Sequence, residues 1–252
     1  MGMTGRALTA GVFFLCSLSA ASAAPSADAL LRAAFDNWRA KSSVSEIAMT
    51  VHRPDWERTS QMKAWTRGDD DALVRFTAPA KDAGNATLKR GPDTWVFNPK
   101  LNQVIKLPAS MLAQSWMGSD FSYNDLSKAD DVLTQYSHRL LGSEQAGGHT
   151  VYAVEALPKP AAPVVWGKIV AKIRDDGVMM AETYYDQDMK PVRSMTTDKV
   201  GILGGRFYPL VMTMRPAGEP GKWTRIVTAS GKFDVTLPDY LFTLSNLQNP
   251  RD

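Results

Sequence analysis

The side chains that most often carry out catalysis or bind metal ions are sparse in this sequence. Its three histidines, His52, His138 and His149, are scattered and do not repeat the short spacing of a metal-binding motif. No Gly-x-Ser-x-Gly sequence marks a nucleophilic serine, and Cys16 is the only cysteine. We therefore expect no catalytic residue, no metal site and no cofactor.

Two groups of aspartates remain as candidates for chemistry. Asp69, Asp70 and Asp71 are consecutive, as acidic residues often are near calcium, but no calcium-binding loop with a closing Glu follows them in register. A solvated turn fits these three residues better. Asp120 and Asp125 could form a carboxylate pair, but they lie where a loop meets a short helix, and there they fit better as capping residues.

The stretch around this second pair, residues 116–126, reads WMGSDFSYNDL and is unusually rich in large side chains. Gly118 permits backbone angles that a side chain forbids, so we expect a tight turn there. Ser119 and Asp120 are good turn or capping residues, because their short side chains bond nearby backbone N–H groups. Residues 121–126 are then able to open a short helical turn.

The first 23 residues have the pattern of a cleavable signal peptide. Arg6 precedes an apolar run over residues 7–18, and residues 21–23 read Ala-Ser-Ala, the small residues that a signal peptidase needs. The run is too short for a permanent membrane helix, and no later apolar stretch reaches spanning length. We expect a mature chain over residues 24–252 that is soluble, has no transmembrane segment and contains no cysteine.

The balance of charge gives no argument for a nucleic-acid partner. The formal net charge is +3, and removal of the leader lowers it to +2, because Arg6 is the only charged residue there. No basic run is long enough to follow a phosphate backbone. Without disulfides, the exported chain depends on its packed core, and it is long enough to build one.

The periodicity of apolar residues changes from helix to strand near residue 44. Residues 26–41 predict an amphipathic helix, with Ser26 as its cap, Asp28 in the first turn and an apolar stripe at three- and four-residue spacing. Short runs of period two, separated by turn residues, follow it and predict about a dozen strands. Beyond the first, at 44–51, these runs lie at 61–67, 72–77, 86–90, 94–98, 103–107, 136–141, 149–157, 166–174, 178–186, 191–198, 206–215 and 223–233.

Such a pattern predicts a mainly β protein with a few helices, formed as a single domain over residues 24–252 around one antiparallel sheet. An open sheet of more than about ten strands tends to curl and to enclose a concave volume. That volume is either filled by large side chains or left hollow for a guest. Composition alone does not separate these alternatives.

Several ordered motifs resemble those of the LolA-like outer-membrane lipoprotein-sorting protein family. Residues 94–101, TWVFNPKL, and residues 103–107, QVIKL, resemble its W-x-aromatic-x-P hairpin, and residues 117–121, MGSDF, resemble its next landmark. Further matches follow in the family's order at residues 125–126, 184–186, 191–193, 204–206, 209, 237–239 and 241–244. The resemblance spans residues 95–247, which is most of the last two thirds of the chain.

The resemblance implies a half-open antiparallel barrel of the LolA/LolB kind, with a helical lid and an apolar cavity that takes acyl chains in the periplasm. It implies a carrier of lipid, or of the acyl chains of lipoproteins, towards the outer membrane. It also implies an inner-membrane transporter of the RND type as a partner. The alternative is an adaptor subunit of such a transporter that carries no cargo; neither function is enzymatic.

Large apolar side chains in and near these motifs are the candidates for the cavity wall or rim. For each of them, ordinary core packing is the competing interpretation. The predicted ligand-binding residues are Trp65, Phe76, Trp95, Phe97, Trp116, Met117 and Phe121.

Overall fold

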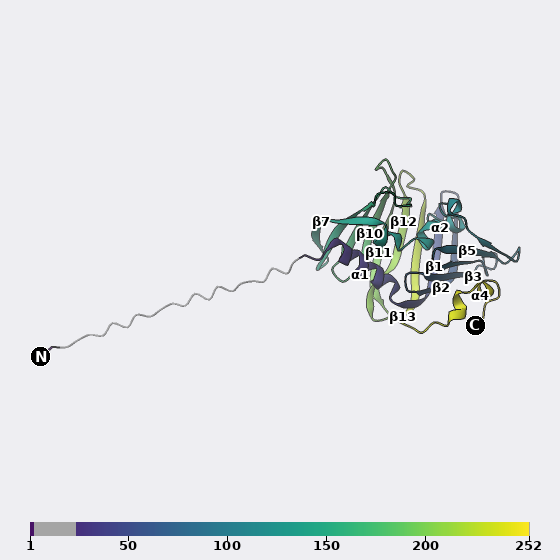
Figure 1. Cartoon of the computed structure of the whole chain (residues 1–252), viewed down its shortest axis with the longest axis horizontal. Helices are drawn as coiled ribbons and strands as arrows, with labels where there is room; N and C mark the ends of the chain where they lie inside the picture. Colours follow the sequence, from purple (N-terminus) through teal and green to yellow (C-terminus); the bar gives the residue numbers. More distant parts are fainter. Residues whose placement is uncertain (3–23, 252) are drawn as a thin grey trace.

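The computed structural model describes residues 1–2 and 24–251 (Figure 1). Apart from its first two residues, the predicted signal peptide lies outside the described residues. Thirteen antiparallel strands form one sheet, in the order β6-β5-β4-β3-β2-β1-β13-β12-β11-β10-β9-β8-β7. The strands are β1 (Ser42–Arg53), β2 (Trp56–Arg67), β3 (Asp71–Ala78), β4 (Ala86–Arg90), β5 (Asp93–Asn98), β6 (Gln103–Lys106), β7 (Tyr136–Ala146), β8 (His149–Pro158), β9 (Lys168–Arg174), β10 (Met179–Tyr185), β11 (Pro191–Leu203), β12 (Arg206–Pro216) and β13 (Trp223–Phe233).

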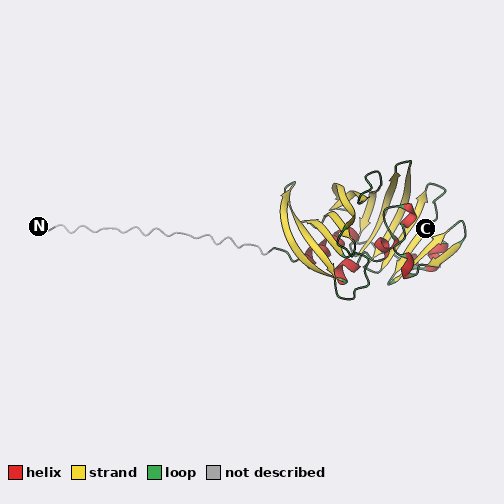
Figure 2. Cartoon of the chain, turned by 90° about the horizontal axis from the view of Figure 1, so that it is seen from above, coloured by secondary structure: helices red, strands yellow, loops and turns green. Residues whose placement is uncertain are grey.

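Neighbours in the chain are neighbours in the sheet, with one exception. Strands β1 to β6 form one meander and β7 to β13 form another, and pairing of β1 with β13 joins the two. The free edges are therefore β6 and β7, which do not pair with each other. Register shifts in several pairings, including β1 with β13 and β11 with β12, mark bulges that bend strands. Figure 2 shows the resulting curved sheet, open on one side.

Helix α1 (Ala27–Arg39) lies on the concave side of the sheet, against the half that contains β8 and β9. It begins at Ser26, whose hydroxyl accepts a hydrogen bond from the Ala29 amide at 3.1 Å. Leu30, Leu31 and Ala34 are buried there against side chains of both strands. The helix predicted for residues 26–41 is confirmed to within two residues at its C-terminal end.

The connection from β6 to β7, residues 107–135, crosses the concave side because it must join the two opposite edges of the sheet. It carries the short helices η1 (Ala109–Met111), η2 (Trp116–Gly118), α2 (Tyr123–Ser127) and α3 (Asp131–Thr134). Trp116 is buried under it against Met62 and Phe76 of the sheet. Gly118 has φ of +73°, which confirms the turn expected at that position.

The C-terminal segment covers the other, convex face of the first meander. It consists of η3 (Asp239–Phe242) and α4 (Leu244–Gln248). Phe242 and Leu247 are almost completely buried against Leu73, Leu88 and Phe97 of β3, β4 and β5. The sequence pattern did not indicate these two helices.

The fold class predicted from the sequence, a mainly β protein with a single open antiparallel sheet and few helices, is confirmed. Every run of period two overlaps one of the strands. Several strands are longer than predicted, and the runs at 103–107, 166–174 and 178–186 extend one or two residues beyond their strands. Within residues 24–251, no helix has the length and apolar character needed to cross a bilayer.

Candidate functional site

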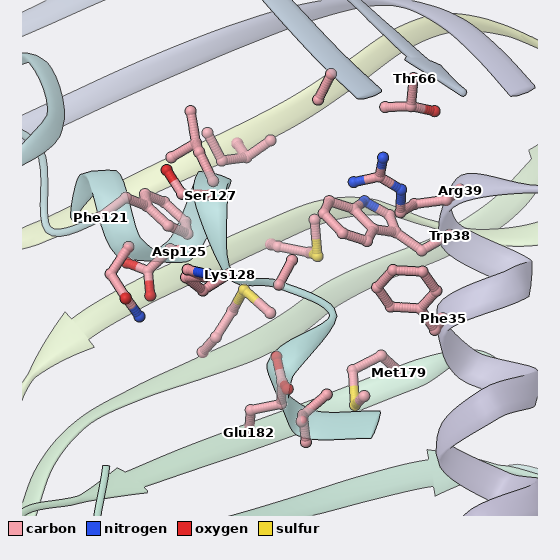
Figure 3. A pocket seen from close by; sticks show the side chains of 18 of the residues that line it. Phe35, Trp38, Arg39, Thr66, Phe121, Asp125, Ser127, Lys128, Met179 and Glu182 are labelled. Carbon is pink, nitrogen blue, oxygen red and sulfur yellow. The ribbon is translucent and has the colours of Figure 1, made fainter. Parts of the chain in front are cut away.

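A cavity of about 310 Å³ lies between the concave face of the sheet, α1 and the 107–135 connection. Figure 3 shows Phe35 and Trp38 of α1 on one side, and Phe121 and Asp125 beside α2 on the other. The sheet between them contributes mainly apolar side chains. These are Ile47, Met62, Ala64, Ala72, Val74, Ile169, Met179, Met195, Met212, Met214 and Ile226.

Four of the seven predicted ligand-binding residues lie together beside this cavity. Trp116 and Phe121 line it. Phe76 lies in β3 with its ring 5.3 Å from that of Trp116, so it supports the wall from behind. Met117 packs in the same cluster, and its carbonyl accepts a hydrogen bond from Arg58.

The other three predicted residues lie on the opposite face of the sheet. Trp65, Trp95 and Phe97 pack in the cluster of Phe242 and Leu247 under the C-terminal segment. Successive side chains of a strand point to opposite faces, and in β2 the neighbours Ala64 and Thr66 line the cavity instead of Trp65. The sequence shows this alternation, but it does not show which face is concave.

Sequence reasoning did not assign Phe35 or Trp38 of α1 to the cavity. Both belong to the apolar stripe of the predicted helix, which had to bury against an unidentified surface. Trp38 lines the cavity while 39% of its surface stays exposed, so it lies at a rim. The signal for Trp38 in the sequence is its position as the last large apolar residue of the amphipathic stripe.

Three arginines from the sheet hold the 107–135 connection in place. Arg53 of β1 forms an ion pair with Asp120, with Nη2 and Oδ1 2.9 Å apart, and Thr224 donates to the same carboxylate at 2.7 Å. Arg58 of β2 donates to the carbonyl of Met117. These are polar contacts to the middle of the connection, and they do not fill the cavity beside it.

Arg193 of β11 supplies the third attachment. It donates to both carboxylate oxygens of Asp125 and to the carbonyl of Asp120. Asp125 also accepts from the Ser122 amide at 2.7 Å, which completes a capping box at the start of α2. Asp125 is thus a capping residue, as expected, and Ser122 is the helix cap. Ser119 has the expected turn role, since its hydroxyl accepts from the Phe121 amide at 3.2 Å, whereas Asp120 pairs with Arg53 and does not cap the helix.

The sheet wall also carries an acidic group, Glu182 of β10, which accepts a hydrogen bond from Tyr184 at 3.0 Å. Burial raises the pKa of the Glu182 carboxyl, and the nearby charge of Asp125 raises it further. Burial likewise raises the pKa of Tyr184 well above its usual value. Both groups therefore favour their neutral forms inside the cavity wall.

Two buried cations near the cavity already have partners. Lys89 of β4 contacts the Asp130 carboxylate at 3.0 Å and the Asp69 carbonyl at 2.5 Å. Arg39 donates to two backbone carbonyls at 3.0 Å, and burial lowers its pKa. Neither cation is placed to attract an anion into the cavity.

The aspartates considered for calcium are engaged elsewhere. Asp69 pairs with Arg32 at 3.1 Å, and Asp71 pairs with Arg67 at 2.7 Å. Among the described residues, only His149, Asp175 and Asp176 gather as a metal-binding group would. Arg174 already contacts the Asp176 carboxylate there, and Asp175 bonds His149, so these ligand atoms are shared with protein partners.

The fold of this chain is similar to that of two solved structures whose names refer to lipoprotein sorting or to the LolA superfamily. A LolA superfamily protein from Nitrosomonas europaea aligns with 87% of this chain and 98% of its own, with a TM-score of 0.72 and 22% identity. A putative outer membrane lipoprotein-sorting protein domain from Vibrio parahaemolyticus aligns with 88% and 98%, with a TM-score of 0.75 and 20% identity. These matches confirm the resemblance found in the sequence motifs.

The family is defined more closely by two further matches. A DUF1329 family protein from Desulfovibrio piger is 26% identical and aligns with 88% of this chain and 97% of its own, with a TM-score of 0.79. A family model described as an uncharacterized protein matches residues 68–249, and the chain belongs to this DUF1329-like family. No curated protein matches the sequence.

Proposed function

We propose that this protein is a periplasmic carrier that binds lipid, or the acyl chains of lipoproteins, in the concave cavity and transfers them towards the outer membrane. The observation that carries the proposal is an apolar cavity of about 310 Å³, within the range of about 300–1,000 Å³ that small-molecule sites occupy. Export as a single domain over residues 24–252, after removal of a signal peptide, completes the proposal. The names of the lipoprotein-sorting relatives support it.

Binding of this kind needs no reactive group. Burial of a CH₂ group contributes roughly 0.8 kcal/mol, so a sixteen-carbon chain gains on the order of 10 kcal/mol before the costs of ordering. The methionines in the wall suit a carrier because their flexible side chains adapt to guests of different shape. In this proposal Trp116 and Phe121 contact the cargo, with Phe76 and Met117 packed behind them.

The helical elements over the cavity act as the lid in this proposal. Lys89 and the three arginines fix the 107–135 connection to the sheet, whereas Trp38 stays partly exposed at the C-terminal end of α1. Displacement of α1 or of α2 would open the cavity for loading and release. An RND-type transporter is the partner proposed to drive it.

The test is a pair of tryptophan substitutions in β1. Ser45 lines the cavity and pairs with Ala64, so Ser45→Trp places a large ring in the hollow. Glu46, the next residue, is exposed, and Glu46→Trp places the same ring on the other face of the strand. We expect Ser45→Trp to weaken binding of a fluorescent fatty acid by at least tenfold, and Glu46→Trp to leave it unchanged.

Wild-type protein that binds no fatty acid and purifies without lipid would contradict the carrier proposal. If Ser45→Trp then still supported the protein's function in cells, the non-carrying adaptor would replace the carrier. A blocked protein that loses both lipid binding and function would support the carrier.

A further inference from the structure

The cavity wall contains a pair of polar side chains on the sheet. One oxygen atom of this pair has no hydrogen-bond partner within the described residues. Glu182 and Tyr184 are on the same face of β10, and both line the cavity. The Tyr184 hydroxyl donates to Glu182 Oε2 at 3.0 Å. Within the described residues, Glu182 makes no other hydrogen bond and no ion pair, so its second carboxyl oxygen is available to a guest.

The nearest cation does not neutralise Glu182. Arg193 lies 4.6 Å from the ring centre of Tyr184 and 4.5 Å from that of Trp166, held between aromatic faces. Its two terminal nitrogens both bond Asp125. The charge of Arg193 is therefore matched by Asp125, and within the described residues Arg193 makes no ion pair with Glu182.

The remaining charged groups of the wall argue against an anionic guest. Lys89 and Arg39 are bonded to protein acceptors. Lys128 lines the cavity on the side of the connection, away from the sheet, and its charge lowers the pKa of the Asp131 carboxyl. A carboxylate or phosphate beside β10 would meet Glu182 and an Arg193 already matched by Asp125, whereas an uncharged polar group would meet the second carboxyl oxygen of Glu182.

The position of the pair suits the polar end of a cargo molecule. A second cavity of about 260 Å³ adjoins the first, and Phe121, Asn124 and Trp166 line both. The Tyr184 ring lies 5.2 Å from the Trp166 ring, and Arg193 lines the second cavity. Glu182 and Tyr184 are thus near the boundary between the deep apolar space and a more outward one.

We propose that Glu182 and Tyr184 form a polar subsite that hydrogen-bonds the uncharged ester or amide group at the head of a bound acyl chain. The phenol hydrogen of Tyr184 stays on Glu182 Oε2. The other carboxyl oxygen of Glu182, when protonated, donates to the carbonyl oxygen of that group, and when unprotonated accepts from an amide N–H. The inference rests on the proposed carrier function and narrows it to neutral acyl esters and amides over free fatty acids.

The experiment is competition against a pyrene-tagged alkane, a probe with no polar head. At pH 7 we expect wild-type protein to bind monopalmitoylglycerol about tenfold more tightly than palmitate, because one satisfied buried hydrogen bond is worth about that factor. Glu182→Leu should lose this preference while it keeps its affinity for the alkane. Glu182→Gln, which stays neutral and keeps a donor and an acceptor, should retain most of the preference.

Asp131→Asn is the matched control. Asp131 is another acid of the cavity wall with a pKa raised by burial, but it lies on α3 and not on the sheet beside Tyr184. We expect this variant to behave as wild type. A palmitoylated dipeptide, run beside monopalmitoylglycerol, shows whether the subsite favours a lipoprotein-like amide or a free glycerolipid ester.

Two results would overturn the subsite. One is a Glu182→Leu protein that keeps the full preference for monopalmitoylglycerol; the other is an equal loss in Glu182→Leu and Asp131→Asn. Failure of the wild-type protein to bind even the alkane is a different result, since it would contradict the carrier proposal itself.

Discussion

The two faces of the sheet over β2 to β5 differ in their side chains and in the segments that cover them. On the convex face, Trp95 and Phe97 are packed under Phe242 and Leu247 of the C-terminal segment. On the concave face, smaller side chains such as Ala64 line a cavity of about 310 Å³ beneath the 107–135 connection. The size of the strand side chains and the way each face is covered both contribute to this difference.

The way each cover is attached explains the contrast. The C-terminal segment attaches through apolar side chains that insert directly between those of the strands, and Phe242 and Leu247 are at most 1% exposed. The 107–135 connection attaches through Trp116, which packs against Met62 and Phe76, and through ion pairs in its middle, such as Arg53 with Asp120 and Arg193 with Asp125. Polar contacts of this kind hold a cover in place without requiring that the space beside them be filled.

The largest expected effect on stability comes from removing a side chain that fills the convex face. Phe242→Ala removes a fully buried ring and should lower the free energy of unfolding by about 3–5 kcal/mol, measured by denaturant titration. Because Phe242 lies away from the cavity, affinity for a fluorescent fatty acid should stay unchanged under conditions where the protein is folded. Leu244→Ala, at a residue 45% exposed, should change stability by no more than about 0.5 kcal/mol.

Breaking an attachment of the concave cover should have the next largest effect. Asp125→Ala leaves Arg193 largely buried and unpaired, which costs about 3 kcal/mol of unfolding free energy. It should also speed release of a bound fatty acid, measured by stopped-flow fluorescence, since α2 loses its cap and its anchor. Unchanged release from a destabilised protein would show that α2 is not part of the lid.

The sequence predicts the features of the two faces that depend on local interactions, but not those that depend on packing between distant residues. Local patterns place α1 within two residues, because the Ser26 cap and the apolar stripe are local features. They also place the strands, through alternation. They do not place Trp65, Trp95 or Phe97 on the correct face, since alternation separates two faces without saying which becomes concave.

The C-terminal helices escaped prediction for a related reason. Residues 239–248 form two short helices. They are stabilised because Phe242 and Leu247 pack against strands that are distant in the sequence. Such long-range packing leaves little periodic signal in the sequence. The cap of α2 likewise depends on a distant residue, because Asp125, which completes the capping box with Ser122, pairs with Arg193 of β11.

A smaller effect, dependent on pH, distinguishes the cavity wall from the filled face. Burial raises the pKa of Glu182 in the folded protein, so folding favours the protonated carboxyl. The protonated Glu182 carboxyl contributes fully to stability below about pH 4.5, the pKa of the group in the unfolded chain. This contribution is lost as the pH rises through the higher pKa of the group in the folded protein. Glu182→Gln should therefore be more stable than wild type at pH 8, and this difference should shrink towards pH 4.

Denaturant midpoints of both proteins at the two pH values measure this effect. Glu46→Gln, at an exposed position on the other side of β1, is the control and should show no such trend. A difference between Glu182→Gln and wild type that stays constant from pH 4 to pH 8 would show that folding does not raise the pKa of Glu182.

The most direct measurement is a crystal structure of the protein with a bromine-labelled fatty acid, located by the anomalous scattering of bromine. The account predicts that the bromine lies between α1 and the sheet, in the hollow bordered by Trp116, Met212 and Ile226. Bromine bound instead beneath the C-terminal segment beside Phe242, or no ordered bromine at saturating ligand, would contradict it.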